Sequence, residues 1–291
     1  MYSRVPIFAT ILLLSSCGPD WDPDYYCKGY EPEVASTEAY IVNGEEITEE
    51  TNLSTLALFN EDTGHFTCSA VAYRDQIVIT AGHCIVSSNL SVSRSLKGER
   101  TKVDDIYLHR AYSGYPHGDI AMLHLAEPIE GPFPAGIYDM AAGGYEKDLR
   151  YFCTGMVAQG FGNTKGTNPP GLYSIPYEWG TAEDLFIMET GPVNPDQGVC
   201  DGDSGGGLYA FTQDHPWWQE PTFHIAGIAI GAYGTDTCTG QTRHNNLESY
   251  SMWIYEVVYC MNGGEDRLWP FYDLHGKGYR GTTCEELRKP L

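Results

Sequence analysis

The feature that most constrains the fold is a succession of short apolar runs that starts at Ile41. Runs such as LALF, QIVIT, DIAMLHL, HIAGIAI and SMWIYEVV are separated by segments rich in turn-forming residues. Runs of this length and spacing are typical of strands in all-β barrels or sandwiches, and we expect a helix only at the C-terminal run. Long amphipathic helices and an alternation of strands with helices are absent from the pattern, so an α/β fold is not expected.

Chain length and charge limit the possible partners. A chain of 291 residues can bury a full core, as one large domain or as two lobes. Its formal charge of −22 comes from 39 acidic residues against 17 Lys and Arg, and the acidic residues are scattered along the chain. Such a chain repels phosphates and anionic lipid headgroups, so we expect no nucleic acid partner and no membrane binding through charge.

The N-terminus predicts export. A short basic start, MYSR, precedes the apolar run VPIFATILLL and then SSCG, which together predict a signal peptide over residues 1–16. The apolar run is too short to span a bilayer. Residues 14–17 resemble the lipobox of bacterial lipoproteins, in which the cysteine, here Cys17, carries the lipid. We therefore expect a bacterial cell-envelope lipoprotein of the outer membrane or periplasm, with a secreted protein as the alternative.

The cysteine count fits an exported protein. Of nine cysteines, eight remain if Cys17 is lipidated, and an even number in an oxidising compartment predicts four disulfides. No CxxC pair is present, so we expect no metal site, and no cofactor is implied. Residues 17–40 are acidic and contain proline, which indicates a tether or propeptide. Residues 259–291 contain Cys260 and Cys284 and are expected to form an extension held by a disulfide.

The glycine-rich stretch CDGDSGGG, which contains Ser204, has three chemical interpretations. A calcium-binding EF-hand loop requires a glutamate at its twelfth position, where this chain has Thr212. The nucleophile elbow of α/β-hydrolases, G-x-S-x-G, fits Gly202 to Gly206, and histidines do follow it. That fold requires a strand and helix alternation that the chain lacks.

The third interpretation takes Ser204 as a nucleophile with partners upstream. Serine attacks well only when a base accepts its proton and a carboxylate orients that base. His83 lies in QIVITAGHC and Asp119 in PHGDIAMLHL, each beside an apolar run. The chain order His, Asp, Ser is that of chymotrypsin-type proteases.

The chain resembles chymotrypsin/trypsin-type serine proteases from about Ile41 to Val258, through separated motifs in the family's order. These are IVNG at residues 41–44, Cys68 with ITAGHC ending at Cys84, DIAMLHL, CDGDSGG and AYGTDTC. The resemblance implies two six-stranded antiparallel β-barrels with a boundary near residues 130–150, a C-terminal helix and a short tail. It also implies a serine endopeptidase that acts on proteins or peptides, and we expect a monomer.

The resemblance assigns the catalytic roles. Ser204 is the expected nucleophile, His83 the general base and then general acid, and Asp119 the residue that orients the imidazole. The backbone amides of Gly202 and Ser204 are the expected oxyanion donors.

The resemblance further implies a zymogen. Asp203 is expected to pair with the ammonium group of Ile41 after cleavage between Tyr40 and Ile41. The tether's basic residue is Lys28, away from the cleavage point, so a trypsin-like activator is not expected to cut at Tyr40.

The expected substrate-binding residues carry no carboxylate at the position that gives trypsin its preference. They are Gly198, Val199, Ala232, Tyr233 and Gly234. We therefore expect an aromatic or bulky apolar P1 residue, and such an enzyme could cleave its own Tyr40–Ile41 bond. Ala232 departs from the family, which usually has there a serine that supports the triad carboxylate.

The resemblance implies disulfides between Cys68 and Cys84 and between Cys200 and Cys238. Three pairings remain for the other four cysteines, and we favour Cys27–Cys153 and Cys260–Cys284. The first would keep the tether attached to the activated enzyme.

Two alternative functions stay open. A non-catalytic protease homologue would bind a partner without cleaving it, because fold alone does not establish activity. An esterase would act on lipid-like esters without N-terminal processing.

Overall fold

The computed structural model describes twelve segments of the chain. They are residues 44–48, 51–114, 116–138, 156–162, 171–182, 186–192, 194–212, 222–232, 238–264, 271–272, 278–279 and 283–288. Within these segments no helix combines the length and the apolar character needed to cross a membrane. Several residues singled out from the sequence lie outside the described segments: Cys17, Cys27, Tyr40, Ile41, Cys153, Tyr233 and Gly234.

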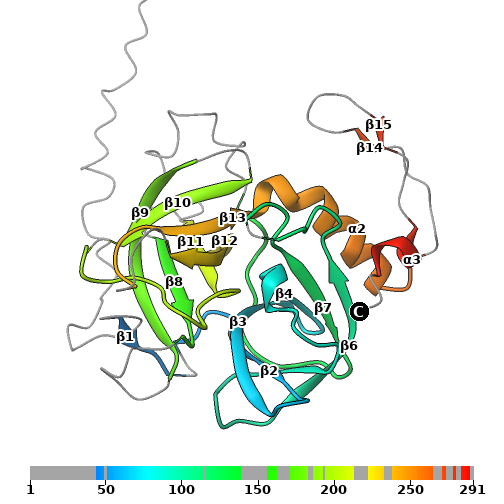
Figure 1. Cartoon of the computed structure of the whole chain (residues 1–291), viewed down its shortest axis with the longest axis horizontal. Helices are drawn as coiled ribbons and strands as arrows, with labels where there is room; N and C mark the ends of the chain where they lie inside the picture. The colour runs from blue at the N-terminus through cyan, green and yellow to red at the C-terminus, as the bar shows by residue number, and fades with distance from the viewer. Residues whose placement is uncertain are drawn as a thin grey trace, which may run out of the picture.

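The first barrel is a closed sheet of six antiparallel strands (Figure 1). In chain order the strands are β2 (Thr55–Asn60), β3 (His65–Arg74), β4 (Ile77–Thr80), β5 (Leu90–Ser93), β6 (Thr101–Leu108) and β7 (Ala121–Leu125). Around the barrel the order is β2, β3, β4, β7, β6 and β5, and β5 closes onto β2. Apolar side chains from the strands, among them Leu56, Val71 and Ile79, are fully buried in its core.

The second barrel is also closed by six antiparallel strands. They are β8 (Met156–Gly160), β9 (Tyr173–Ala182), β10 (Ile187–Pro192), β11 (Gly207–Thr212), β12 (Thr222–Ala232) and β13 (Thr242–Asn246). The β8–β9 pairing closes the ring, and the short β1 (Glu45–Glu46) is added to β9 from outside. Two closed six-stranded antiparallel barrels were expected from the sequence, and this expectation is confirmed.

The C-terminal helix expected from the run SMWIYEVV is also confirmed. A short helix, η2 (Leu247–Tyr250), leads from β13 into α2 (Ser251–Met261). Trp253, Ile254 and Val257 on α2 are buried against the core of the first barrel. The helix therefore carries the chain from the second barrel back to the first (Figure 1).

The tail after α2 is fastened to the first barrel. It contains β14 (Phe271–Tyr272), β15 (Gly278–Tyr279) and α3 (Cys284–Leu287). A disulfide joins Cys260 at the end of α2 to Cys284, the pair favoured from the sequence. Beyond α3, Arg288 forms an ion pair of 3.0 Å with Asp105 and donates a hydrogen bond of 3.0 Å to the Tyr107 hydroxyl, both on β6. The end of the tail is thus held against α2 and strand β6 of the first barrel.

Candidate active site

Two hydrogen bonds join His83 to Asp119. His83 lies on the short helix η1 (Gly82–Cys84) after β4, and Asp119 lies two residues before β7. The two Asp119 carboxylate oxygens are used separately: the His83 backbone N–H donates to Oδ1 at 2.7 Å, and His83 Nδ1 donates to Oδ2 at 2.8 Å. The Asp119 side chain is 0% exposed and that of His83 is 31% exposed. The carboxylate is therefore sealed from water, while the imidazole can be reached.

Neighbouring residues hold this pair in place. A Cβ at Gly82 would lie 3.1 Å from Asp119 Oδ1 and 3.0 Å from Leu108 Cδ1, so glycine allows the helix to approach the carboxylate closely. From the second barrel, Asn245 Nδ2 donates to the Asp119 backbone oxygen at 2.6 Å. Asn245 was not identified from the sequence, because no motif marks a contact between residues so far apart in the chain.

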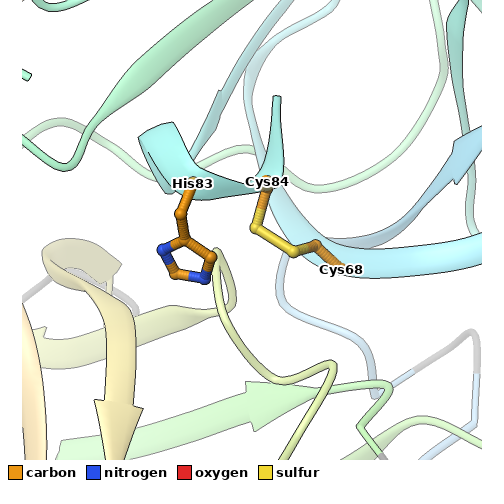
Figure 2. Close-up of side chains that lie close together, drawn as sticks. All are labelled: Cys68, His83 and Cys84. Carbon is orange, nitrogen blue, oxygen red and sulfur yellow. A yellow bond between two sulfur atoms is a disulfide. The ribbon is translucent and has the colours of Figure 1, made fainter. Parts of the chain in front are cut away.

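Ser204 lies on a tight loop that contacts the loop of His83. The loop runs from Cys200 to β11 and turns at Gly202 and Gly205, whose φ angles of +93° and +84° favour glycine. The Ser204 carbonyl oxygen lies 3.7 Å from Cys84 Sγ, and Cys84 directly follows His83. Figure 2 shows the His83 ring projecting from η1 beside the Cys68–Cys84 disulfide. The structure thus brings the loop of Ser204 to the loop of His83.

The backbone amides of Gly202 and Ser204 donate to no backbone carbonyl of the described residues. The Asp203 carbonyl accepts from Gly206 N at 2.8 Å, which turns the Ser204 N–H of the same peptide group away from Gly206. Amides arranged in this way can bind an anion.

Asp203, a residue of this loop, is buried and has no positive partner among the described residues. Its carboxylate accepts from Gly162 N and from Cys200 N, both at 2.7 Å. A Cβ at Gly160 or Gly162 would lie 2.2 or 2.3 Å from this side chain, so the two glycines make room for it. Burial raises the pKa of Asp203 to about 7, although the two amide hydrogen bonds lower it. A cation beside Asp203 would favour its charged form, and the described residues supply none.

This burial predicts a pH dependence for the uncleaved chain. Because the pKa of Asp203 rises from 3.8 to about 7 on folding, the folded chain binds the proton more tightly, and stability falls as pH rises between these values. We expect the melting temperature of the uncleaved Ser204→Ala protein to fall more between pH 4.5 and pH 8 than that of the double variant with Asp203→Asn. Equal falls in the two proteins would contradict the assignment.

The expected substrate-binding residues Gly198 and Val199 lie near Tyr177 and Thr242 of the second barrel. A Cβ at Gly198 would lie 2.4 Å from the Cys238 carbonyl oxygen, so this position is closed to larger side chains. Beneath Val199, the Tyr177 hydroxyl is hydrogen-bonded to Thr242 Oγ1 at 2.7 Å and to the Val199 backbone. Burial lowers the pKa of His244 beside Tyr177 to about 3, so its imidazole is neutral.

Strand β12 is hydrogen-bonded to the Ser204 loop at Ala229. Ala229 accepts from Gly205 N at 2.7 Å and donates to the Gly206 carbonyl at 2.9 Å. Ala232, one of the expected substrate-binding residues, is the last residue of this strand. Cys238 is bonded to Cys200, the pair implied by the resemblance.

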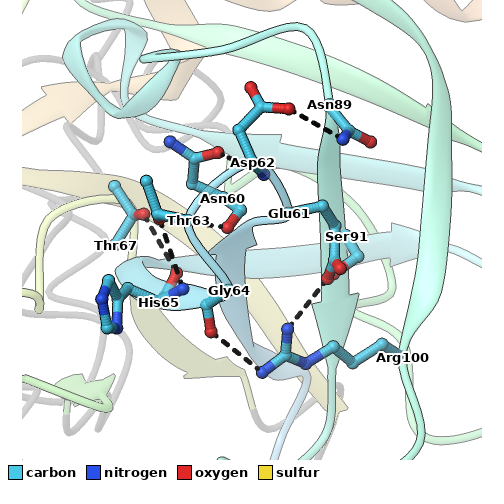
Figure 3. A network of polar contacts seen from close by, with 10 residues as sticks. All are labelled: Asn60, Glu61, Asp62, Thr63, Gly64, His65, Thr67, Asn89, Ser91 and Arg100. Atoms are coloured by element: carbon cyan, nitrogen blue, oxygen red, sulfur yellow. Dashed lines mark hydrogen bonds and ion pairs between the residues drawn. The ribbon is translucent and has the colours of Figure 1, made fainter.

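A hydrogen-bonded network links the β2–β3 hairpin to the loop that follows His83 (Figure 3). Asp62 accepts from Ser87 and, at 2.9 Å, from Asn89, while Arg100 pairs with Glu61 at 2.9 Å. The Arg100 guanidinium also lies 3.7 Å from the centre of the Phe59 ring. These contacts hold the loop between η1 and β5 against the β2–β3 hairpin.

Cys68, His83 and Cys84 form a group of the kind found in metal sites. A metal would require cysteine thiolates, and here the two sulfur atoms are joined to each other (Figure 2). The group therefore braces the histidine loop and does not fit a metal.

Comparison with known proteins agrees with this geometry. The family model "Trypsin" matches residues 41–254. The human protein named chymotrypsin-like elastase family member 3B is 24% identical over 261 residues, which cover 79% of this chain and 93% of that protein. The protein of the same name from Macaca mulatta is 24% identical over 264 residues, covering 79% and 98%. Disulfides and membership of such a family indicate an exported protein. Because the family match spans well over half of the sequence, this chain belongs to the trypsin family.

Proposed function

We propose that the protein is a serine endopeptidase that hydrolyses peptide bonds through Ser204, His83 and Asp119. Membership of the trypsin family implies protein or peptide substrates. The observation that carries the proposal is the buried Asp119 carboxylate, which holds both the backbone and Nδ1 of His83. Because Nδ1 donates its hydrogen, Nε2 is left to accept a proton.

The chemistry follows from this arrangement. Ser204 Oγ attacks the peptide carbonyl carbon while His83 Nε2 takes the hydroxyl proton, and Asp119 stabilises the imidazolium. The Gly202 and Ser204 amides bind the oxygen that becomes negative. His83 then gives the proton to the departing amine and leaves an acyl-enzyme, which water hydrolyses by the same steps.

The activation proposal rests on Asp203. Its buried carboxylate has a raised pKa and lies directly before Ser204. Cleavage between Tyr40 and Ile41 would create an ammonium group that can pair with it, and a paired charge is far less costly to bury. The chain is then a zymogen whose Ser204 loop is stabilised by processing.

The proposed P1 preference is aromatic or bulky apolar. Its support is that Tyr177, Thr242 and the neutral His244, none of them charged, lie near Gly198 and Val199. Such an enzyme could process itself at Tyr40. If the purified Ser204→Ala precursor were cleaved at Tyr40 as fast as the wild type, self-processing would be wrong.

The N-terminal part of the proposal is a lipid anchor at Cys17 and a bond between Cys27 and Cys153, which would hold the active enzyme at the membrane. Mass mapping under non-reducing conditions tests the bond, and Cys27 found free or bonded elsewhere would remove the retention argument.

Incubation of the processed protein with a peptide library tests the function as a whole. Cleavage after aromatic or bulky apolar residues is the expected result. Hydrolysis of lipid-like esters alone would favour an esterase, and the absence of any cleavage would favour a non-catalytic homologue.

A further inference from the structure

A serine outside the expected triad connects the Ser204 loop to both barrels. Ser69, on β3 next to Cys68, is fully buried. Its backbone N–H donates to the Ser204 carbonyl oxygen at 2.9 Å, and its Oγ donates to the Gly202 carbonyl oxygen at 2.9 Å. Ser69 therefore holds the carbonyls of the two residues whose amides are the proposed oxyanion donors.

The same hydroxyl also binds the segment that holds Asp203. Ser69 Oγ accepts from Phe161 N at 2.9 Å, and the next residue, Gly162, donates its N–H to Asp203. On the opposite side, Thr80 Oγ1 donates to the Ser69 carbonyl at 2.9 Å. The backbone N–H, the backbone carbonyl and the hydroxyl of Ser69 are thus all hydrogen-bonded. Their partners lie in the Ser204 loop, at Phe161 and at Thr80 on β4.

The loop needs such a restraint because its glycines allow many backbone conformations. Gly202 has a φ of +93° and no side chain to limit its rotation. A peptide group is planar, so fixing the Gly202 carbonyl also fixes the Asp203 N–H, which donates to Cys200 O at 3.0 Å. The loop also packs tightly on Ser69, since a Cβ at Gly205 would lie 2.1 Å from the Ser69 carbonyl oxygen.

We propose that Ser69 is a positioning residue whose hydroxyl sets the orientation of the Gly202 and Ser204 amides toward the reacting oxygen. The inference rests on the proposed peptidase function and extends it to a residue of the other barrel. Oxyanion donors act only when they lie at hydrogen-bond distance from the negative oxygen, so a loosened loop should slow the chemical step more than it weakens binding.

A fluorophosphonate probe tests this without knowledge of the natural substrate. Ser204 Oγ forms a bond to phosphorus, the phosphorus–fluorine bond breaks, and fluoride leaves while His83 accepts the serine proton. The phosphoryl oxygen then occupies the oxyanion position. The rate constant of inactivation, kinact, reports the chemical step, and KI reports binding of the probe.

In the processed protein, Ser69→Ala should lower kinact by about 10- to 100-fold and change KI by less than about threefold. Ser54→Ala is the matched control, because Ser54 is equally buried in the first barrel and bonds the Tyr209 hydroxyl at 3.2 Å instead of the loop. The control should lose a similar amount of thermal stability and keep kinact within about twofold.

Two results would overturn the inference: a kinact for Ser69→Ala within about threefold of wild type, or an equal loss for Ser54→Ala. If Ser69→Ala does not fold, the test uses Ser69→Thr and Ser69→Val instead. Threonine and valine have the same shape, but only threonine has a hydroxyl. Equal kinact values for these two variants would overturn the inference. A wild-type protein that the probe does not label would instead contradict the proposed function itself.

Discussion

Replacement of His83 by alanine should lower kcat/KM for a peptide substrate by about 10⁴- to 10⁶-fold. Removal of the imidazole removes the proposed base that takes the Ser204 proton as the hydroxyl attacks the carbonyl. Steady-state hydrolysis by the processed protein measures the loss, and circular dichroism checks the fold.

The chain contains a matched control for this experiment. His124 on β7 also pairs with a carboxylate, since its Nδ1 lies 2.6 Å from Asp104 Oδ1, but it lies on the surface of the first barrel. His124→Ala should keep kcat/KM within about threefold of wild type, because a partly exposed contact of this kind contributes little to the fold. Comparable activity of His83→Ala and His124→Ala would rule out His83 as the base.

Replacement of Asp203 by asparagine should lower kcat of the processed protein by about 10²- to 10³-fold, the loss that follows from removing an oxyanion donor. An amide cannot pair as an anion with the Ile41 ammonium. It also cannot accept at both positions where Gly162 N and Cys200 N now donate. The Ser204 loop should therefore lose its fixed geometry, even though Ser204 and His83 are intact.

Asp201 provides the control for the second experiment. It lies two residues from Asp203, its side chain is exposed, and Asp201→Asn removes the same charge. We expect kcat for Asp201→Asn within about threefold of wild type. N-terminal sequencing must show that each variant begins at Ile41. If a correctly processed Asp203→Asn protein keeps wild-type kcat, the proposed pairing with Ile41 is wrong.

Much of the fold could be predicted from local patterns and motif order. The short apolar runs predicted strands because strands of this length bury alternate or continuous apolar residues. The order of His83, Asp119 and Ser204 distinguished this loop from a hydrolase elbow, and the structure places the histidine loop beside the serine loop. The Cys260–Cys284 pair could be favoured because both cysteines lie in the tail.

The supports of the site could not be predicted, because they depend on contacts between distant parts of the chain. Asn245 binds the Asp119 backbone from 126 positions away, and the Ser69 hydroxyl reaches Gly202 across 133 positions. Neither residue stands in a motif that names a role. The bulge in β12 between Ala229 and Gly231 likewise depends on the pairing of β12 with β13. No sequence motif marks its position.

The most direct test of the account is labelling with a fluorophosphonate, followed by mass spectrometry to identify the modified residue. The account predicts that Ser204 is modified in protein that begins at Ile41, and that the uncleaved precursor reacts far more slowly. Modification of a different residue, or a processed and folded protein that does not react at all, would contradict it.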